Sequence, residues 1–140
     1  MKLSISIIVL FVFQLSFSQT ILGKWKTIDD ETGKEMGVVQ IFENKGKVFG
    51  KIIEIVDQDK RHLKCVKCSG EDHNKPILGM TILKGLTKNG SVYNGGEIID
   101  PKNGKSYKCK ITLKGKDKLI VRGYIGISLF GRSQNWIREN

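Results

Sequence analysis

The most constraining feature of the sequence is the segment 106–114, in which apolar and polar residues alternate without a break. Its apolar positions are Tyr107, Cys109, Ile111 and Leu113. A period of two places successive side chains on opposite faces of a β-strand. The segment is therefore predicted to be an antiparallel strand with one face on a core and the other in water.

Seven further segments carry strand patterns at short, regular spacing: 23–28, 37–43, 47–56, 77–86, 91–99, 118–124 and 133–138. Turn sequences such as Asn89-Gly90 and Asn103-Gly104 separate them and tolerate positive φ. Strands joined by short turns pair antiparallel with their neighbours. We therefore predict an all-β fold, a single antiparallel up-and-down β-barrel of about eight strands, since closure removes exposed sheet edges.

The first 18 residues have the layout of a secretory signal peptide. Lys2 is followed by an apolar run over residues 5–13 and by the small-residue pattern Ser16-Phe17-Ser18. The alternative is an uncleaved anchor, but a membrane-spanning helix needs about 20 apolar residues. We predict cleavage after Ser18, a single domain over 19–140 without a membrane span, and a periplasmic or extracellular location.

The chain is basic, with 24 Lys and Arg against 14 Asp and Glu and a net charge of +10. This balance favours an anionic component of the cell envelope as a partner, or describes no more than a solvated lysine-rich surface. Nucleic acid is not an expected partner, because the few aromatic residues do not cluster with the basic ones as in a base-stacking platform. No cofactor is predicted.

The long connection between the third and fourth predicted strands holds the motif Cys65-Val66-Lys67-Cys68. In an exported protein the first interpretation is a local disulfide that pins this loop. A redox dithiol is the second, although the βαβ context typical of that motif is absent. The third is a metal site in which His62 and His73 join the two cysteines. Cys109 falls on the inward side of its strand and is expected to behave as a small buried apolar residue. The alternative is a disulfide to Cys65 or Cys68, which would tie the long loop to the barrel.

The C-terminal part combines glycines with aromatic and basic side chains that either line one mouth of a barrel or form core and corners. The candidate ligand-binding residues are Tyr107, Arg122, Tyr124, Phe130, Arg132 and Trp136. Asp100 is expected to cap a hairpin turn through its side chain.

The sequence contains no nucleophile elbow, no zinc-protease motif and no phosphate loop. The leading hypothesis is therefore a non-enzymatic protein that binds a small apolar or amphipathic envelope ligand. An enzyme acting on an envelope component is the alternative, and it requires Asp100, Tyr107, Arg122 and Arg132 to converge. A third hypothesis is an interaction module that uses its lysines.

Gly23-Lys24-Trp25 opens the first strand, and Arg138 ends the last one. This resembles the calycin barrels, lipocalins among them, in which a Gly-x-Trp tryptophan closes one end of the barrel beneath a basic residue. A guanidinium stacked on an indole contributes about 0.5–2 kcal/mol. The resemblance implies a structural role for Trp25 and Arg138.

Motifs over essentially the whole domain resemble the bacterial exported-protein family called domain of unknown function 2147. They are Gly23-x-Trp25, Cys65-x-x-Cys68, Pro76-Ile77-Leu78-Gly79, Gly95-Gly96-x-Ile98-x-Asp100-Pro101, Leu119-x-Val121-Arg122-Gly123-Tyr124 and Phe130-Gly131-Arg132-x-Gln134-x-Trp136. The resemblance implies a secreted or periplasmic β-barrel-like domain and carries no established activity.

Overall fold

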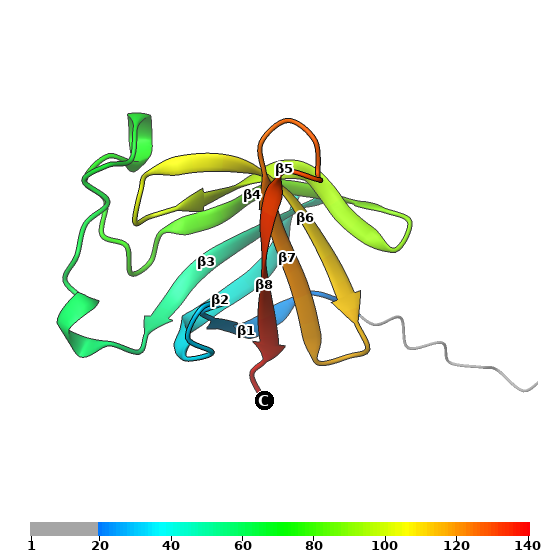
Figure 1. Ribbon diagram of the computed structural model, residues 1–140, viewed down its shortest axis with the longest axis horizontal. Helices are drawn as coiled ribbons and strands as arrows, with labels where there is room; N and C mark the ends of the chain where they lie inside the picture. Colours follow the sequence, from blue (N-terminus) through cyan, green and yellow to red (C-terminus); the bar gives the residue numbers. More distant parts are fainter. Residues whose placement is uncertain (1–19) are drawn as a thin grey trace, which may run out of the picture.

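A computed structural model describes residues 20–140 of the chain. The predicted signal peptide, residues 1–18, lies outside the described residues. The described chain forms eight strands (Figure 1): β1 Gly23–Ile28, β2 Glu35–Asn44, β3 Lys47–Ile55, β4 Thr81–Asn89, β5 Val92–Asp100, β6 Lys105–Lys114, β7 Lys118–Tyr124 and β8 Gly131–Arg138. Within these residues no helix is long and apolar enough to span a bilayer.

Each strand pairs antiparallel with the next one in the sequence, and β1 pairs with β8 to close the barrel. Closure is made by the register Trp25↔Arg138 and Thr27↔Trp136. The predicted single up-and-down barrel of eight antiparallel strands is confirmed. Alternating strand direction places the β1–β2, β3–β4, β5–β6 and β7–β8 connections at one end, which we call the open end. The three short turns lie at the other, closed end.

The core fills the half of the barrel interior nearer the closed end and extends outside the barrel to the disulfide of the β3–β4 connection. Its largest fully buried side chains are Trp25, Trp136, Ile21, Ile41, Leu83, Leu86, Ile111, Leu119, Val39, Cys65 and Cys109. In β6 the buried positions Cys109 and Ile111 alternate with more exposed lysines, as the sequence pattern predicts. Burial of such side chains stabilises the fold by about 1.5–3 kcal/mol each.

The predicted boundaries differ most at β4, which begins at Thr81 rather than at residue 77. The preceding apolar residues belong to the long connection 56–80, where Gly79 adopts a φ of +93°. The chain already approaches β3 here, because the N–H of Gly79 donates to the carbonyl of Ile52 (2.8 Å). Ile77 packs against the core from this connection. Burial of a loop residue therefore produces the apolar pattern that predicted a longer strand.

The connection 56–80 is compact and contains two short 3-10 helices, η1 Gln58–Lys60 and η2 Gly70–Asp72. In Figure 1 it forms the green lobe beside the barrel. Its two arms are joined by the bridge Lys64↔Pro76 and by a hydrogen bond from the N–H of Cys65 to the carbonyl of Lys75 (2.8 Å). The lobe is held against the barrel by Asp72, whose carboxylate accepts a hydrogen bond from Nζ of Lys84 on β4 (2.6 Å).

Candidate ligand-binding site

The inner face of the barrel divides into a packed half and an accessible half. Near the closed end Trp25, Leu119 and Trp136 have lost 99% or more of their exposure. Arg138 lies over Trp25, with its guanidinium carbon 4.2 Å from the ring centroid. Its Nη2 donates to the carbonyl of Thr20 (2.7 Å), so the N-terminal segment is tied beneath the same end. The geometry is that of the barrel closure that the Gly-x-Trp motif implies.

Toward the open end, inward-facing side chains keep part of their exposure. The pairs Val39↔Ile52, Leu83↔Ile98 and Val121↔Gln134 place these partners on the same face as buried core residues. The pairs Ile98↔Tyr107 and Gly123↔Arg132 continue that face upward. We call this accessible half the cup; its side chains are Ile52, Ile98, Tyr107, Arg132 and Gln134.

In a closed barrel an inward-facing side chain meets solvent only through the open end. The cup residues are partly or largely exposed, whereas the core residues beneath them are buried, and the open end is the direct route for water to Ile52, Ile98 and Gln134. Gly123 widens the space, because a Cβ at this position would already lie 3.4 Å from atoms of Ile98 and Tyr107. A glycine at this point leaves room that any larger residue would occupy.

The cup is amphipathic. Ile52 and Ile98 pack on the core and offer apolar surface, while the hydroxyl of Tyr107 accepts a hydrogen bond from the amide of Asn103 (3.0 Å). Across the barrel, Oε1 of Gln134 accepts a hydrogen bond from the indole N–H of Trp136 (3.3 Å). The cup thus combines an apolar wall with polar groups that fix orientation, which is the usual composition of a small-molecule site.

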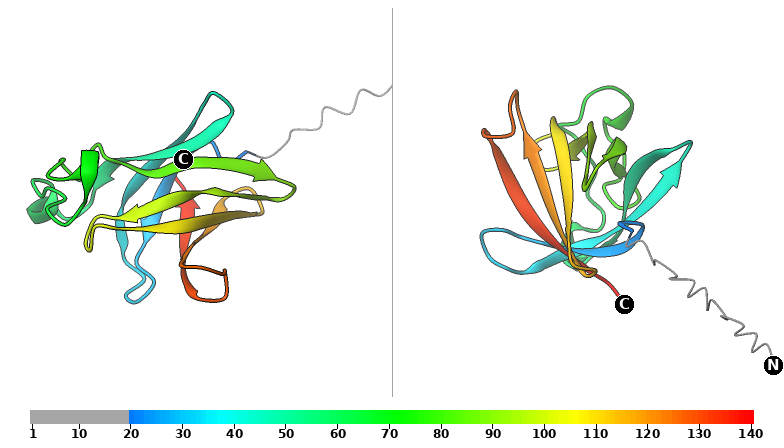
Figure 2. Two further views of the ribbon diagram at one scale, coloured as in Figure 1. Left: turned by 90° about the horizontal axis from the view of Figure 1, so that it is seen from above. Right: turned by 90° about the vertical axis from the view of Figure 1, so that its right-hand side faces the viewer.

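Arg132 spans the rim. Its Nη2 donates to Oδ1 of Asp30 and to Oε1 of Glu31, both at 2.9 Å, and its Nε also bonds to Asp30. The β1–β2 and β7–β8 connections extend side by side in the left view of Figure 2. The guanidinium lowers the pKa of Asp30 through these hydrogen bonds, and the two carboxylates raise the pKa of Arg132. Arg132 therefore stays charged and links the β7–β8 end of the barrel to the β1–β2 loop through its ion pairs.

The predicted ligand-binding residues are not gathered in one place. Tyr107 and Arg132 belong to the cup. Arg122 pairs with Ser133 on the outer face, where its side chain bonds to the β7–β8 loop. Tyr124 alternates with Gly123 and also faces outward. The remaining two predicted residues lie in neither place: Phe130 is exposed in the β7–β8 loop, and Trp136 is buried in the core.

The residues of the enzyme hypothesis have separate partners. The carboxylate of Asp100 accepts a hydrogen bond from the N–H of Lys102 (2.9 Å) and caps the β5–β6 turn. Tyr107 bonds to Asn103, Arg132 bonds to the β1–β2 loop, and Arg122 lies on the opposite face of the sheet. The convergence that the hypothesis requires is not found among these four side chains.

Cys65 and Cys68 form a disulfide, with Cα atoms 5.3 Å apart. This confirms the first interpretation of the motif, and it occupies both sulfurs of the alternative zinc set. The imidazole of His73 lies 3.0 Å from the carbonyl oxygen of Cys68, whereas His62 is exposed in the preceding segment. Over residues 20–140 no cluster of three or more potential metal ligands is found. Cys109 is a free, buried thiol.

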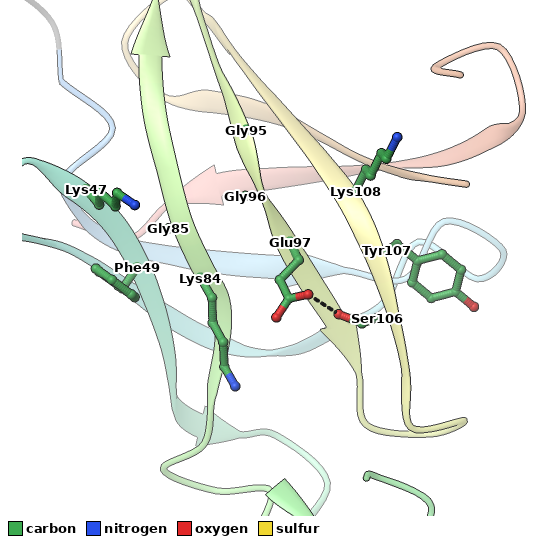
Figure 3. A pocket seen from close by; sticks show the side chains of 10 residues that line it. All are labelled: Lys47, Phe49, Lys84, Gly85, Gly95, Gly96, Glu97, Ser106, Tyr107 and Lys108. Carbon is green, nitrogen blue, oxygen red and sulfur yellow. Dashed lines mark hydrogen bonds between the residues drawn. The ribbon is translucent and has the colours of Figure 1, made fainter. Parts of the chain in front are cut away.

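The outer face carries a hollow of its own, which the sequence did not predict (Figure 3). This outer groove has a volume of about 640 Å³ and is lined by Lys47, Phe49, Lys84, Gly85, Gly95, Gly96, Glu97, Ser106, Tyr107 and Lys108. The hydroxyl of Ser106 donates to Glu97 (2.7 Å) between β5 and β6, while the ring of Tyr107 points away from that pair. The sequence feature that could have predicted this groove is the set of glycines at 85, 95 and 96 in two neighbouring strands, because they have no side chains to fill it.

Comparison with known proteins agrees with this architecture. The structure is similar to protein HP1028 from the human pathogen Helicobacter pylori, described as belonging to the lipocalin family. The TM-score is 0.77 and the sequence identity 21%, over 88% of this chain and 85% of the other, a likeness that concerns the fold. No curated protein matches the sequence. Residues 23–138 match the family described as "Uncharacterized protein conserved in bacteria (DUF2147)". The predicted resemblance is confirmed, and the chain belongs to the DUF2147 family.

Proposed function

We propose that this protein binds a small amphipathic molecule in the cup, without catalysing a reaction on it. The observation that carries the proposal is the contrast between the two halves of the interior: the lower half is sealed, and the upper half keeps accessible inward-facing side chains. Eight-stranded barrels are just wide enough to be filled by side chains or to hold one small ligand. The buried lower half is filled by side chains, and the accessible side chains of the upper half support the second case.

The lining of the cup defines the chemical class of the ligand. An apolar part would contact Ile52 and Ile98, and a polar end would reach Gln134 and the hydroxyl of Tyr107. Arg132 is already matched by Asp30 and Glu31, so its charge is not free to select a strongly anionic head group. A neutral or weakly charged amphiphile fits this arrangement best.

We also propose that the protein is exported. The predicted signal peptide and a disulfide between Cys65 and Cys68 support this location, because disulfides persist in oxidising compartments. The proposed ligand is then a component that meets the protein in the cell envelope or outside the cell.

A neutral fluorescent probe of apolar sites, N-phenyl-1-naphthylamine, tests the proposed site. We expect saturable enhancement of its emission, and we expect Gly123→Leu to weaken binding at least about tenfold, since the new side chain enters the space beside Ile98 and Tyr107. Thr112→Leu adds the same side chain to the outward face of β6 and serves as the matched control. Equal binding by the wild type and Gly123→Leu would place the probe elsewhere and overturn the proposal. Cooperative thermal unfolding of both variants shows that the folds are intact.

A further inference from the structure

The β7–β8 loop, residues 125–130, ends in a cluster of exposed apolar side chains. Ile125, Ile127, Leu129 and Phe130 are 66%, 59%, 77% and 69% exposed. The loop projects beyond the barrel, as the orange segment in Figures 1 and 2 shows. We call these four side chains the apolar tip. Apolar residues scattered singly over a surface are ordinary, but four in one six-residue loop form a contiguous patch of the kind that marks an interaction site.

The carbonyl groups of the loop are bonded within the protein. Every carbonyl from residue 126 to residue 130 accepts a hydrogen bond from the protein itself. The N–H groups of Ile125 and Phe130 donate to the carbonyls of Phe130 (3.3 Å) and Ile127 (3.1 Å). Side chains supply the rest: Nζ of Lys108 reaches Gly126 (3.2 Å), Nε of Arg122 reaches Ser128 (2.7 Å), and Nη2 of Arg122 reaches Leu129 (3.4 Å).

This arrangement has a consequence for where the tip can go. Moving an unsatisfied carbonyl out of water is costly, whereas a carbonyl already bonded within the protein leaves water at a much smaller cost. The loop therefore bonds its carbonyl oxygens within the protein and exposes its apolar side chains. It resembles, in its chemistry, an element that enters the interfacial layer of a bilayer.

The cations at the base of the loop identify the partner more closely. Lys108 and Arg122 bond to carbonyl oxygens, and within residues 20–140 neither forms an ion pair with a carboxylate. Their charges thus remain uncompensated just below the apolar tip. They are available to the phosphates of a lipid surface, and the chain as a whole carries a net charge of +10.

We infer that the β7–β8 loop docks on bilayers that contain anionic phospholipid. The apolar tip enters the acyl boundary, and Lys108 and Arg122 lie against the head groups. Apolar burial and attraction to anionic lipid together set the strength of such interfacial binding. The inference does not depend on the cup, because the loop can bind a membrane whether or not a ligand is present.

Co-sedimentation of the full protein with lipid vesicles tests the inference. Vesicles of phosphatidylethanolamine with phosphatidylglycerol should bind the protein, and vesicles of phosphatidylcholine alone should bind it far less. Leu129→Ser combined with Phe130→Ser should weaken binding to the anionic vesicles at least about tenfold, because two large side chains no longer enter the lipid. The matched control is Leu63→Ser with Val66→Ser, which removes two exposed apolar side chains from the connection 56–80 and should leave binding unchanged.

A spectroscopic probe locates the contact. The native tryptophans, Trp25 and Trp136, are buried, so Ile127→Trp adds the one indole that lies in water at the tip. Its emission should shift to shorter wavelength when anionic vesicles are added. An unshifted spectrum, or equal vesicle binding by the serine double variant and the wild type, would overturn the inference. So would vesicle-independent self-association that the same double variant abolishes, because the tip would then serve a second copy of the chain.

Discussion

Gly104, in the β5–β6 turn, shows how a missing side chain positions a whole segment. It has a φ of +71°, and a Cβ there would lie 2.0 Å from the carbonyl oxygen of Lys67. The turn therefore presses directly on the backbone beside the disulfide. Sγ of Cys65 lies 3.5 Å from the carbonyl oxygen of Pro101 in the same turn. The long connection is seated against the barrel at this contact.

Gly104→Ala should consequently lower the free energy of unfolding for two reasons. The new side chain would be strained at a positive φ, and its Cβ would clash with the backbone of Lys67. Gly33 is the matched control, since its φ is +73° and a Cβ added there would meet no atom within 4 Å beyond its chain neighbours. We expect Gly33→Ala to cost about 1 kcal/mol and Gly104→Ala about 2–4 kcal/mol, measured by urea denaturation. Equal losses for the two variants would mean that the turn does not press on the connection.

Cys109 is a residue whose chemistry is set by its surroundings. Burial raises the pKa of its thiol to about 12. Because the thiolate is the reactive form, Ellman's reagent should modify the native protein very slowly at mildly alkaline pH and release one thiol per chain after denaturation without reductant. Rapid reaction of the native protein, or three thiols after denaturation, would contradict the cysteine assignments.

At the scale of elements, the connection 56–80 depends on Asp72. The ion pairs with Lys84 and Lys75 bring Asp72 against β4 and hold the pKa of its carboxyl below the ordinary value of 3.8, chiefly through the hydrogen bond from Lys84. A carboxyl with a lowered pKa stabilises the folded state above its unfolded pKa. That contribution is lost as the pH falls through the lower, folded pKa.

Asp72→Asn should therefore reduce the free energy of unfolding by roughly 1–2 kcal/mol at neutral pH. The difference from the wild type should shrink as the pH falls below about 4, where the native carboxyl is also losing its charge. Glu71→Gln, an exposed neighbour in the same short helix, is the control and should have little effect. Denaturation curves across this pH range measure both. A difference that stays constant with pH would show that the ion pair is not the cause.

The sequence predicted the elements well where a strand has one dry and one wet face. The ranges 23–28 and 118–124 agree with β1 and β7, and 106–114 agrees with β6 to within one residue. It failed at residues 77–80, because Ile77 packs against the core and Met80 is buried although both lie in a loop. It also gave no sign that Ile82 and Ile99 are buried on the outer side of the sheet, since alternation assigns a residue to a face but does not show what covers that face.

The candidate site was predicted only in part, for a related reason. Alternation places Tyr107 inward, but it does not reveal how far along the barrel a residue lies. Trp136 and Arg132 both face inward from β8, and only the register with β7 and β1 separates the sealed core from the rim. Arg122 was selected for its chemistry, and the strand pairing puts it on the outer face.

At the scale of the whole molecule, the barrel is divided into a sealed half and an accessible half. Trp25 and Arg138 close one end, and the cup opens at the other, next to the apolar tip. Docking of the tip on a bilayer would bring the rim of the cup close to a source of amphiphiles. The two proposals are compatible with each other, and each can fail alone.

The outer groove is the alternative to the cup as the place where a ligand could bind. It has measurable volume and a lining of Lys47, Phe49 and Lys84 among other residues, so a ligand that prefers it would show a different footprint. The cup and the outer groove lie on opposite faces of the same strands, with Tyr107 turned inward and Ser106 outward. A residue-by-residue map of binding distinguishes the two sites.

Chemical-shift mapping by nuclear magnetic resonance, during titration with a neutral single-chain amphiphile kept below its micelle concentration, tests ligand binding in the cup most directly. We predict saturable shifts concentrated at Ile52, Ile98, Gly123 and Gln134, with the amides of the outer groove on β3 unmoved. Shifts confined to the outer groove, or no saturable shifts in the cup, would contradict the proposed binding site.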